Sequence, residues 1–143
     1  MLEYRSAPTA DIPALTLYAI LRLRVDVFVV EQECAYPELD GRDVEPTAVQ
    51  LWAEDAGEVA ATLRLLTDGA DRRIGRVATA ASARGHGVAA ELMRRALAQC
   101  EGSVVRLDAQ AHLAHWYARF GFEPDGPEFD EDGIPHVPMI RTA

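Results

Sequence analysis

The chain has little cysteine and no long apolar run, and both absences limit what it can be. Cys34 and Cys100 are the only cysteines, too few and too isolated for a disulfide framework or a thiolate metal site, which fits a reducing compartment. No apolar run approaches the roughly 20 residues that cross a bilayer, and the amino terminus lacks the pattern of a signal sequence. We therefore expect a cytoplasmic protein that does not contact the membrane.

Positive charge is also scarce. The 14 basic side chains, all arginine, face 23 aspartates and glutamates, so the formal net charge is -9. Such a charge repels a polyanion over most of the surface, which argues against nucleic acid as a partner and favours a small cationic substrate. The apolar fraction of 49% can fill one core, and 143 residues predict a single domain over residues 1–143.

Hydrophobic periodicity predicts a mixed α/β domain of the α+β kind, with strands and helices interspersed. Two strands joined by the turn at Ala56–Gly57 read as a hairpin, and the strand after them would lie antiparallel to the second. One or two further strands are expected in the tail beyond Gly121, which caps the last helix. The predicted strands are residues 2–7, 49–55, 58–68, 73–80 and 103–108, and the predicted helices are residues 14–30, 87–100 and 111–120.

One detail of this prediction is open, and several possible metal-binding side chains need an interpretation. The first helix has an uncertain end, because the β-branched run at residues 27–30 could turn extended. The segments PELDGRD, residues 37–43, and EFDEDG, residues 128–133, are expected to be solvated acidic loops rather than metal sites. His112 and His115 lie one helical turn apart but lack a third ligand, so no metal is expected.

The turn RGHGVA at residues 84–89 has three interpretations. Its glycines can simply permit a tight turn. Alternatively, Gly85, Gly87 and Ala90 match a dinucleotide-binding fingerprint, with Asp108 as the ribose-binding acid, although too few residues follow for that fold. In the third interpretation, successive backbone N–H groups at a helix start hold a diphosphate, Arg84 adds a cation, and the side chains of His86 and Val88 matter little.

Three motifs in order resemble the GNAT superfamily of N-acetyltransferases. The pattern R-x-x-G-x-A at Arg84, Gly87 and Ala89 resembles the acyl-CoA motif of that superfamily, and WYARFGF at residues 116–122 resembles its second signature. The segments LYAILRLRVDVFVVEQECAYPELDGRD, LDAQAHL and EDGIPHVPM resemble the ElaA-like branch. Together these similarities extend from about Leu17 to Met139.

The resemblance implies a mostly antiparallel twisted sheet with a splayed central strand pair and helices on both faces. It implies acetyl-CoA as cosubstrate, no metal, and a small-molecule or peptide amine as acceptor, acetylated by direct attack in a ternary complex. Main-chain groups at the gap would pair with the pantetheine arm and polarise the thioester. The implied cofactor-binding residues are Val77, Ala78, Thr79, Arg84, Gly85, His86, Gly87, Val88, Ala89, Gln110 and Tyr117.

Two residues are candidate catalysts. By its place in the second motif, Tyr117 is the candidate general acid, although its helical spacing also suits a core aromatic. Glu31 is the candidate general base, ahead of His136. Two other functions stay open, a non-catalytic acyl-CoA-binding sensor and a dinucleotide-binding protein. An edge strand could also pair two subunits into a homodimer.

Overall fold

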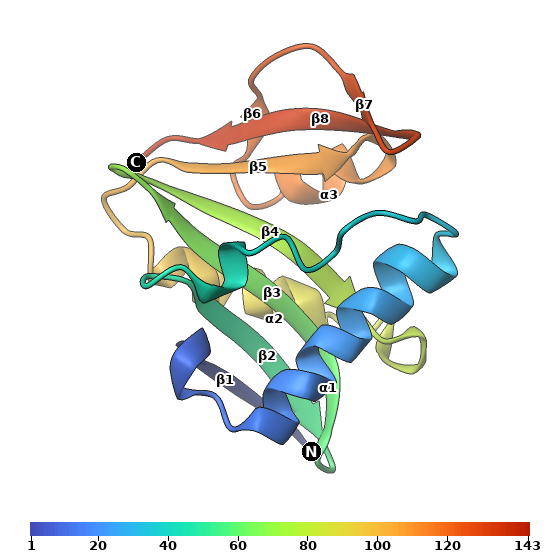
Figure 1. Ribbon diagram of the computed structural model, residues 1–143. Coiled ribbons are helices and arrows are strands. Elements are labelled where there is room, and N and C mark those ends of the chain that lie inside the picture. The colour runs from blue at the N-terminus through green and yellow to red at the C-terminus, as the bar shows by residue number, and fades with distance from the viewer.

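All eight strands of the computed structural model, which describes residues 1–143, form one twisted sheet (Figure 1). Neighbouring strands are antiparallel except for one parallel pair, β4 and β5, so the predicted mixed and mostly antiparallel fold is confirmed. In spatial order the strands are β1 (Leu2–Pro8), β2 (Val49–Asp55), β3 (Glu58–Asp68), β4 (Asp71–Thr79), β5 (Val105–Gln110), β8 (Ile134–Arg141) and β6 (Glu123–Pro124), with β7 (Phe129–Glu131) also pairing with β8.

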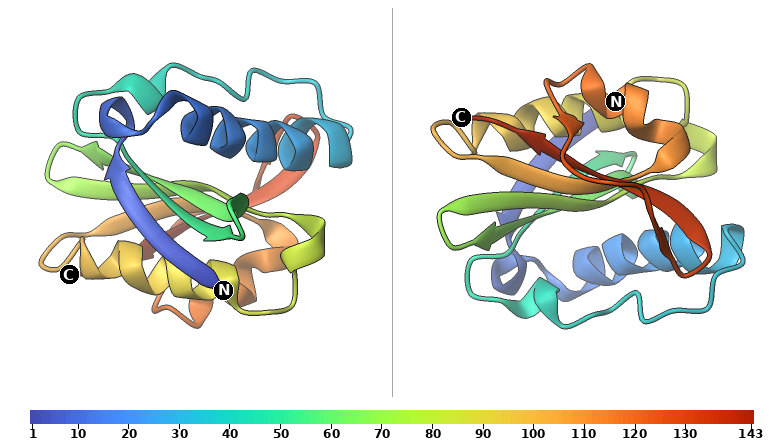
Figure 2. Two further views of the ribbon diagram at one scale, coloured as in Figure 1. Left: turned by 90° about the horizontal axis from the view of Figure 1, so that it is seen from below. Right: turned by 90° about the horizontal axis from the view of Figure 1, so that it is seen from above.

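Helices cover both faces of the sheet, as predicted (Figure 2). The helix α1 (Ala14–Val25) and the helical turn η2 (Asp26–Glu31) lie on one face, and α2 (Val88–Ala98) and α3 (Ala114–Ala118) lie on the other. Short 3-10 turns complete the helical segments: η1 (Thr9–Asp11), η3 (Arg42–Val44), η4 (Ala81–Ala83) and η5 (Ala111–Leu113).

The first helix does not become extended at its end. The β-branched run after Val25 continues as η2, a π-helical turn that ends at Glu31. Packing explains why local propensity is overridden, since Val27 is buried with Leu23 and with Ala78 of β4. The helix predicted over residues 14–30 is therefore confirmed, the extended alternative for its end is excluded, and the helical backbone reaches Glu31.

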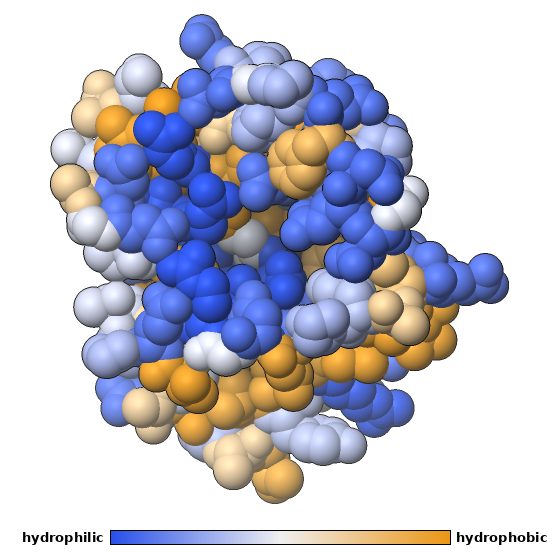
Figure 3. All heavy atoms as spheres, turned by 45° about the horizontal axis from the view of Figure 1, so that its top comes forward, coloured by the Kyte–Doolittle hydropathy of each residue, from blue (hydrophilic) through white to orange (hydrophobic).

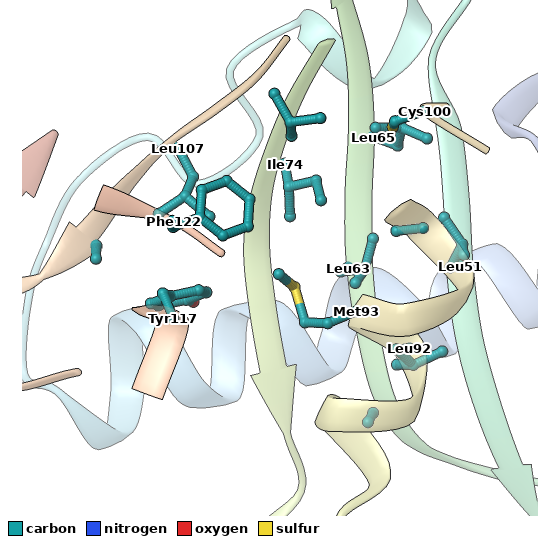
Figure 4. Packing of buried hydrophobic residues seen from close by; sticks show 14 of the residues in the cluster. Leu51, Leu63, Leu65, Ile74, Leu92, Met93, Cys100, Leu107, Tyr117 and Phe122 are labelled. Atoms are coloured by element: carbon teal, nitrogen blue, oxygen red, sulfur yellow. The ribbon is translucent and has the colours of Figure 1, made fainter. Parts of the chain in front are cut away.

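The main core lies between the sheet and α2. Residues at alternate positions of the strands meet the apolar stripe of α2, in which Leu92 and Met93 are fully buried (Figure 4). The hairpin prediction is confirmed, because β2 and β3 pair through a turn in which Ala56 and Gly57 have φ of 52° and 84°. Strand residues labelled in this core are Leu51, Leu63, Leu65, Ile74 and Leu107.

The tail contains three strands rather than the one or two predicted. Prolines 135 and 138 lie within β8 and do not interrupt it, because proline loses only a donor and keeps its carbonyl. Asp125 N–H donates to the Pro138 carbonyl at 2.7 Å. The third helix is shorter than predicted, five residues after η5, and Gly121 at φ 90° follows it as the expected cap.

The central strand pair is splayed, as the resemblance implies. The parallel ladder of β4 with β5 has only two rungs, Arg72 with Val105 and Arg73 with Arg106. On its other edge β4 carries a β-bulge, since Thr62 of β3 pairs with Ala78 while Arg64 pairs with Gly75. Beyond Arg73 and Arg106 the two strands separate and leave a gap, which the bulge borders.

This topology does not suit the dinucleotide-binding interpretation. That fold needs consecutive βαβ units in a parallel sheet, and here β4 and β5 are the only parallel neighbours. Strands β1 and β6 lie at the two ends of the sheet, and a homodimer through either edge stays a prediction. No helix combines the length and the apolar character needed to span a membrane.

Candidate functional site

The main-chain groups of two β4 residues, Val77 and Thr79, point toward the gap. Ala80 N–H donates to the Ala60 carbonyl of β3 at 2.8 Å, and Ala78 pairs with Thr62 in the same ladder. Because main-chain groups alternate in direction along a strand, those of Val77 and Thr79 point toward β5. No rung of the β4–β5 ladder uses them. The main-chain groups of Val77 and the N–H of Thr79 are therefore available to an extended ligand in the gap, whereas the Thr79 carbonyl accepts from Arg84 and the main chain of Ala78 is occupied by β3.

The backbone amides at the start of α2 have no partner within the chain. Arg84 N–H donates to the Ala81 carbonyl at 3.5 Å, and the next bond of the main chain is from Glu91 N–H to the Gly87 carbonyl at 3.1 Å. No amide of residues 85–90 donates to a backbone or side-chain acceptor. This run of donors lies at the positive end of the α2 dipole, where an anion is stabilised.

The two glycines of this turn are required by backbone conformation rather than by space. Gly85 and Gly87 have φ of 80° and 73°, in the left-handed region, and a Cβ at either position would meet nothing within 4 Å. His86 is exposed, but Val88 is only 3% exposed and belongs to the main core. Val88 therefore anchors the start of α2 to the sheet, while the expectation that neither side chain matters for holding the diphosphate stays a prediction.

Arg84 links the end of β4 to the helical turn η2. Its Nε donates to the Thr79 carbonyl at 3.2 Å, and its Nη2 donates to Glu31 Oε1 at 2.7 Å. Both side chains are nearly half exposed. The hydrogen bond from Arg84 lowers the pKa of the Glu31 carboxyl below its usual range. The candidate base and the candidate diphosphate-binding cation are thus in direct contact.

Tyr117 extends from α3 into the core on the β5 side (Figure 4). Its side chain is 8% exposed and makes edge contacts with Trp116 and Phe122, at ring-centroid distances of 4.9 Å and 6.5 Å. Burial raises the pKa of Tyr117 to about 12. The hydroxyl therefore stays protonated near neutral pH, as a proton donor must. The core cluster that holds it contains Leu107 of β5 and Ile74 of β4, one from each side of the gap.

Gln110 and His136 lie on the face of the sheet that carries α1. Gln110 Nε2 donates to Gln32 Oε1, just after η2, at 3.2 Å. His136 is directly opposite Gln110 in the β5–β8 ladder and therefore shares its face. The His136 Nδ1 lies 2.7 Å from the Ile134 carbonyl, and its Nε2 lies 3.9 Å from the Glu131 carboxylate.

A buried ion cluster beside the gap was not predicted from the sequence. Arg24 of α1 is fully buried, and it donates to Glu38 Oε2 at 2.7 Å and to Asp43 Oδ1 at 2.6 Å. Glu38 and Asp43 are only 3% and 7% exposed, so the expectation of a solvated loop is wrong for residues 37–43. For residues 128–133 the acids are exposed as expected, but Phe129–Glu131 form the strand β7 rather than a loop.

The cluster continues across the sheet to β4. Arg64 of β3 donates to both carboxylate oxygens of Asp40, at 2.8 Å and 3.1 Å, and Arg76 of β4 donates to Asp40 Oδ2 at 3.2 Å and to Glu38 Oε2 at 2.9 Å. Burial alone would raise the pKa of Asp40, but the hydrogen bond and the charge of Arg64 hold it at about 2. The Asp40 carboxyl is therefore ionised in the neutral range.

The sequence did contain a signal for this cluster. Ile20, Leu23, Arg24 and Val27 are the buried residues of α1 and η2, so Arg24 occupies a core position in the helical period. An arginine at such a position requires buried acids as partners. The partners lie 14 and 19 residues away, beyond the range of any local pattern.

The remaining candidates take simple structural places. Asp108, the acid of the dinucleotide interpretation, accepts a hydrogen bond from Arg73 across the start of the gap at 3.4 Å. Cys34 and Cys100 are both free. No group of three or more histidine, cysteine, aspartate or glutamate side chains is arranged to hold a metal ion. The molecular surface is hollowed near the centre of the face shown in Figure 3, and hydrophilic side chains surround the hollow.

Comparison with known proteins gives consistent matches. A family model described as an acetyltransferase (GNAT) domain matches residues 24–143. The UPF0039 protein Rv2851c of Mycobacterium tuberculosis is 51% identical, over 93% of this chain and 88% of the relative. Protein ElaA of Escherichia coli is 38% identical, over 100% of this chain and 98% of the relative.

Two solved structures share nearly the whole fold. An acyl-CoA N-acyltransferase from Pseudomonas aeruginosa superposes with a TM-score of 0.94 at 40% identity, covering 99% of this chain and 100% of that one. The crystal structure of Escherichia coli ElaA gives a TM-score of 0.93 at 36% identity, covering 99% of each chain.

Proposed function

Because this chain belongs to the GNAT acetyltransferase family and is an acyltransferase of the ElaA-like branch, we propose that it uses acetyl-CoA to acetylate a primary amine. The acceptor is a small molecule or a peptide, and the amine attacks the thioester directly in a ternary complex. One observation carries the proposal. The backbone amides of residues 85–90 have no hydrogen-bond partner, and they follow the end of β4 that no longer pairs with β5.

The cosubstrate fits this arrangement in two parts. The diphosphate accepts hydrogen bonds from the amides of the turn, with Arg84 as the added cation. The pantetheine arm carries amides of its own, and it pairs with the main chain of Val77 and Thr79 as an added strand would. Ala78 and Gln110 border the arm. In this proposal the contact set is residues 77–79, 84–89, Gln110 and Tyr117.

The chemistry requires one bond to form and one to break. The amine nitrogen bonds to the acyl carbon, the carbon–sulfur bond breaks, and the thiolate leaves. A main-chain N–H of β4 stabilises charge on the acyl oxygen, an effect worth about 3 kcal/mol per donor. Glu31 takes one proton from the ammonium, directly or through water, and Tyr117 protonates the thiolate; the second proton of the attacking nitrogen then returns to Tyr117. Neither cysteine is needed, since no covalent enzyme intermediate forms.

Charge supports an amine as the acceptor. The net charge is -9, and the exposed acids of residues 128–132 lie on and beside β7, next to the strand that carries His136. An acidic surface attracts a cation and speeds its arrival. We place this reaction in the cytoplasm, where two free cysteines stay reduced.

Titration calorimetry with acetyl-CoA tests the cosubstrate. The wild type should bind, and Gly87→Ala should bind roughly tenfold more weakly, because a left-handed alanine costs about 1–2 kcal/mol at the site of the anion. Gly57→Ala is the matched control: it has φ of 84° and equally free space, but lies in the β2–β3 turn. It should bind like the wild type.

Turnover is tested by release of the coenzyme A thiol in the presence of a panel of amines. We expect release that depends on one class of amine. Absence of binding at millimolar acetyl-CoA would overturn the proposed function, and binding without turnover on any amine would reduce the protein to an acyl-CoA sensor.

A further inference from the structure

Arg76 occupies an unusual backbone conformation at the edge of the gap. It lies in the β-bulge of β4, where two residues, Arg76 and Val77, oppose Leu63 alone. Its φ is 52°, in the left-handed region, which costs a residue with a side chain about 1–2 kcal/mol. The pairing of β4 with β5 stops before this residue, at Arg73. The gap thus opens after Arg73, and the bulge lies in the part of β4 that borders it.

The Arg76 side chain is tied to the loop at residues 36–43. Its Nε donates to Glu38 Oε2 at 2.9 Å, and its Nη2 reaches the Glu38 carbonyl at 3.4 Å and Asp40 Oδ2 at 3.2 Å. The guanidinium also lies over the Tyr36 ring, 5.6 Å from its centre. One side chain therefore makes three hydrogen bonds and a ring contact from a strained position.

The acceptors of these bonds are themselves fixed. Glu38 is held by the fully buried Arg24 of α1, and Asp40 is held by both nitrogens of Arg64 on β3. Charge-assisted hydrogen bonds of this kind are strong and directional, and water has little access to those at the buried Glu38. The bulge is consequently connected to α1 and to β3 through side chains, in addition to its own ladder.

We propose that Arg76 is a positioning residue, and that its bonds to Glu38 and Asp40 fix the bulge so that the Val77 N–H is aimed at the acyl carbonyl. This inference rests on the proposed function. A donor stabilises developing charge only when it is already in place, so a small rotation of this peptide reduces the rate without removing any binding group. The ion cluster then serves the reaction as well as the stability of the fold.

Isotope-edited infrared spectroscopy tests the aim of the amide. Acetyl-CoA labelled with carbon-13 at the acetyl carbonyl is bound to each variant, and the carbonyl stretch is compared with that of free acetyl-CoA. The wild type should lower the frequency, because a hydrogen bond weakens the carbonyl bond. In Arg76→Ala the frequency should return toward the free value, and in Arg76→Lys it should return in part, since lysine keeps the charge but not the forked geometry.

Arg73→Ala is the matched control. Arg73 lies on the same strand before the bulge, and its partners Asp68 and Asp108 are partly exposed. We expect the wild-type carbonyl frequency in this variant. Arg76→Gly removes the same bonds but also relieves the left-handed strain. If Arg76→Gly keeps the wild-type frequency, the backbone holds the bulge unaided and the proposal fails.

Kinetics provide a second measurement. Arg76→Ala should lower kcat at least tenfold and leave the dissociation constant of coenzyme A within about twofold of the wild type, because the diphosphate site is intact. Asp40→Asn is a milder variant in case Arg76→Ala does not fold, and it should shift both readouts in the same direction. Equal losses of affinity and kcat would instead indicate general damage and overturn the proposal.

The two levels of inference fail differently. If the wild type binds no acetyl-CoA, the proposed function fails. If the wild type binds it and shows a lowered carbonyl frequency that Arg76→Ala retains, the proposed function stands and the role of Arg76 is wrong.

Discussion

At the β4–β5 gap, the two faces of the sheet are built from different chemistry: α2 covers one side and α1 the other. On the side of α2, main-chain amides lie at a helix start, and the side chains that α2 packs against the sheet are apolar. On the side of α1, charged side chains dominate, and they include the fully buried Arg24. A ligand held by the main chain is insensitive to most substitutions, whereas an ion cluster fails when one member is lost. We therefore expect mutations on the two sides to have different consequences.

The largest effect should come from the charged side. Arg24→Ala leaves Glu38 and Asp43 buried without their shared cation, and the free energy of unfolding should fall by about 3–5 kcal/mol. Chemical denaturation measures this change. Arg22→Ala, on the same helix, is the control, because its pair with Asp26 is 3.9 Å long and largely exposed. That loss should stay below about 1 kcal/mol. Equal losses in the two variants would contradict the difference between the sides.

A second variant separates chemistry from binding. Tyr117→Phe keeps the ring in the core but removes the proton donor, so kcat should fall about 100-fold while the affinity for acetyl-CoA stays nearly unchanged. Steady-state kinetics and calorimetry measure the two quantities. Tyr18→Phe, which alters a tyrosine that is 68% exposed, should match the wild type. Full activity in Tyr117→Phe would make Tyr117 a packing residue only.

The smallest effect should come from Glu31→Gln. The bond from Arg84 lowers the pKa of Glu31, and a carboxylate with a lowered pKa is a weak base, so kcat/KM should fall only roughly tenfold. The sign of the pH dependence follows: the carboxylate is present above the usual glutamate pKa and is lost only as pH falls through the lowered value. The wild-type profile should therefore stay flat to lower pH than an ordinary glutamate allows.

The control for this profile is Glu33→Gln, which changes a neighbouring exposed carboxylate. Its profile should coincide with that of the wild type. If Glu31→Gln also coincides with the wild type, Glu31 is no base, and its contact with Arg84 only joins η2 to the turn.

The sequence predicted the elements whose patterns are local. Alternation from Val49 to Thr79 specified three antiparallel strands, and the apolar stripe of α2 specified a helix that begins beside Gly87. The end of the first helix was less predictable, because β-branched residues favour strands in isolation. There the burial of Val27 against β4 decided the conformation.

The contacts around the site depend on long-range pairing, and most of them were not predictable. Nothing near Arg76 in the chain indicates a left-handed residue in a strand, since its partners Glu38 and Asp40 lie 38 and 36 residues away. The contact between Glu31 and Arg84 joins residues 53 apart. The motif resemblance did locate the turn at residues 84–89. Its backbone conformation depends on Gly85 and Gly87 within the turn itself, so a local sequence pattern was enough to indicate it.

The two-rung ladder between β4 and β5 has a consequence for how the sequence of this enzyme can evolve. Main-chain donors and acceptors at the gap are supplied by every amino acid except proline, so substitutions at Val77 and Thr79 can alter the shape of the gap without deleting its hydrogen-bonding groups. Under the proposed function, acceptor preference would then diverge through the surrounding loops while the main-chain contacts to the acyl carrier are kept.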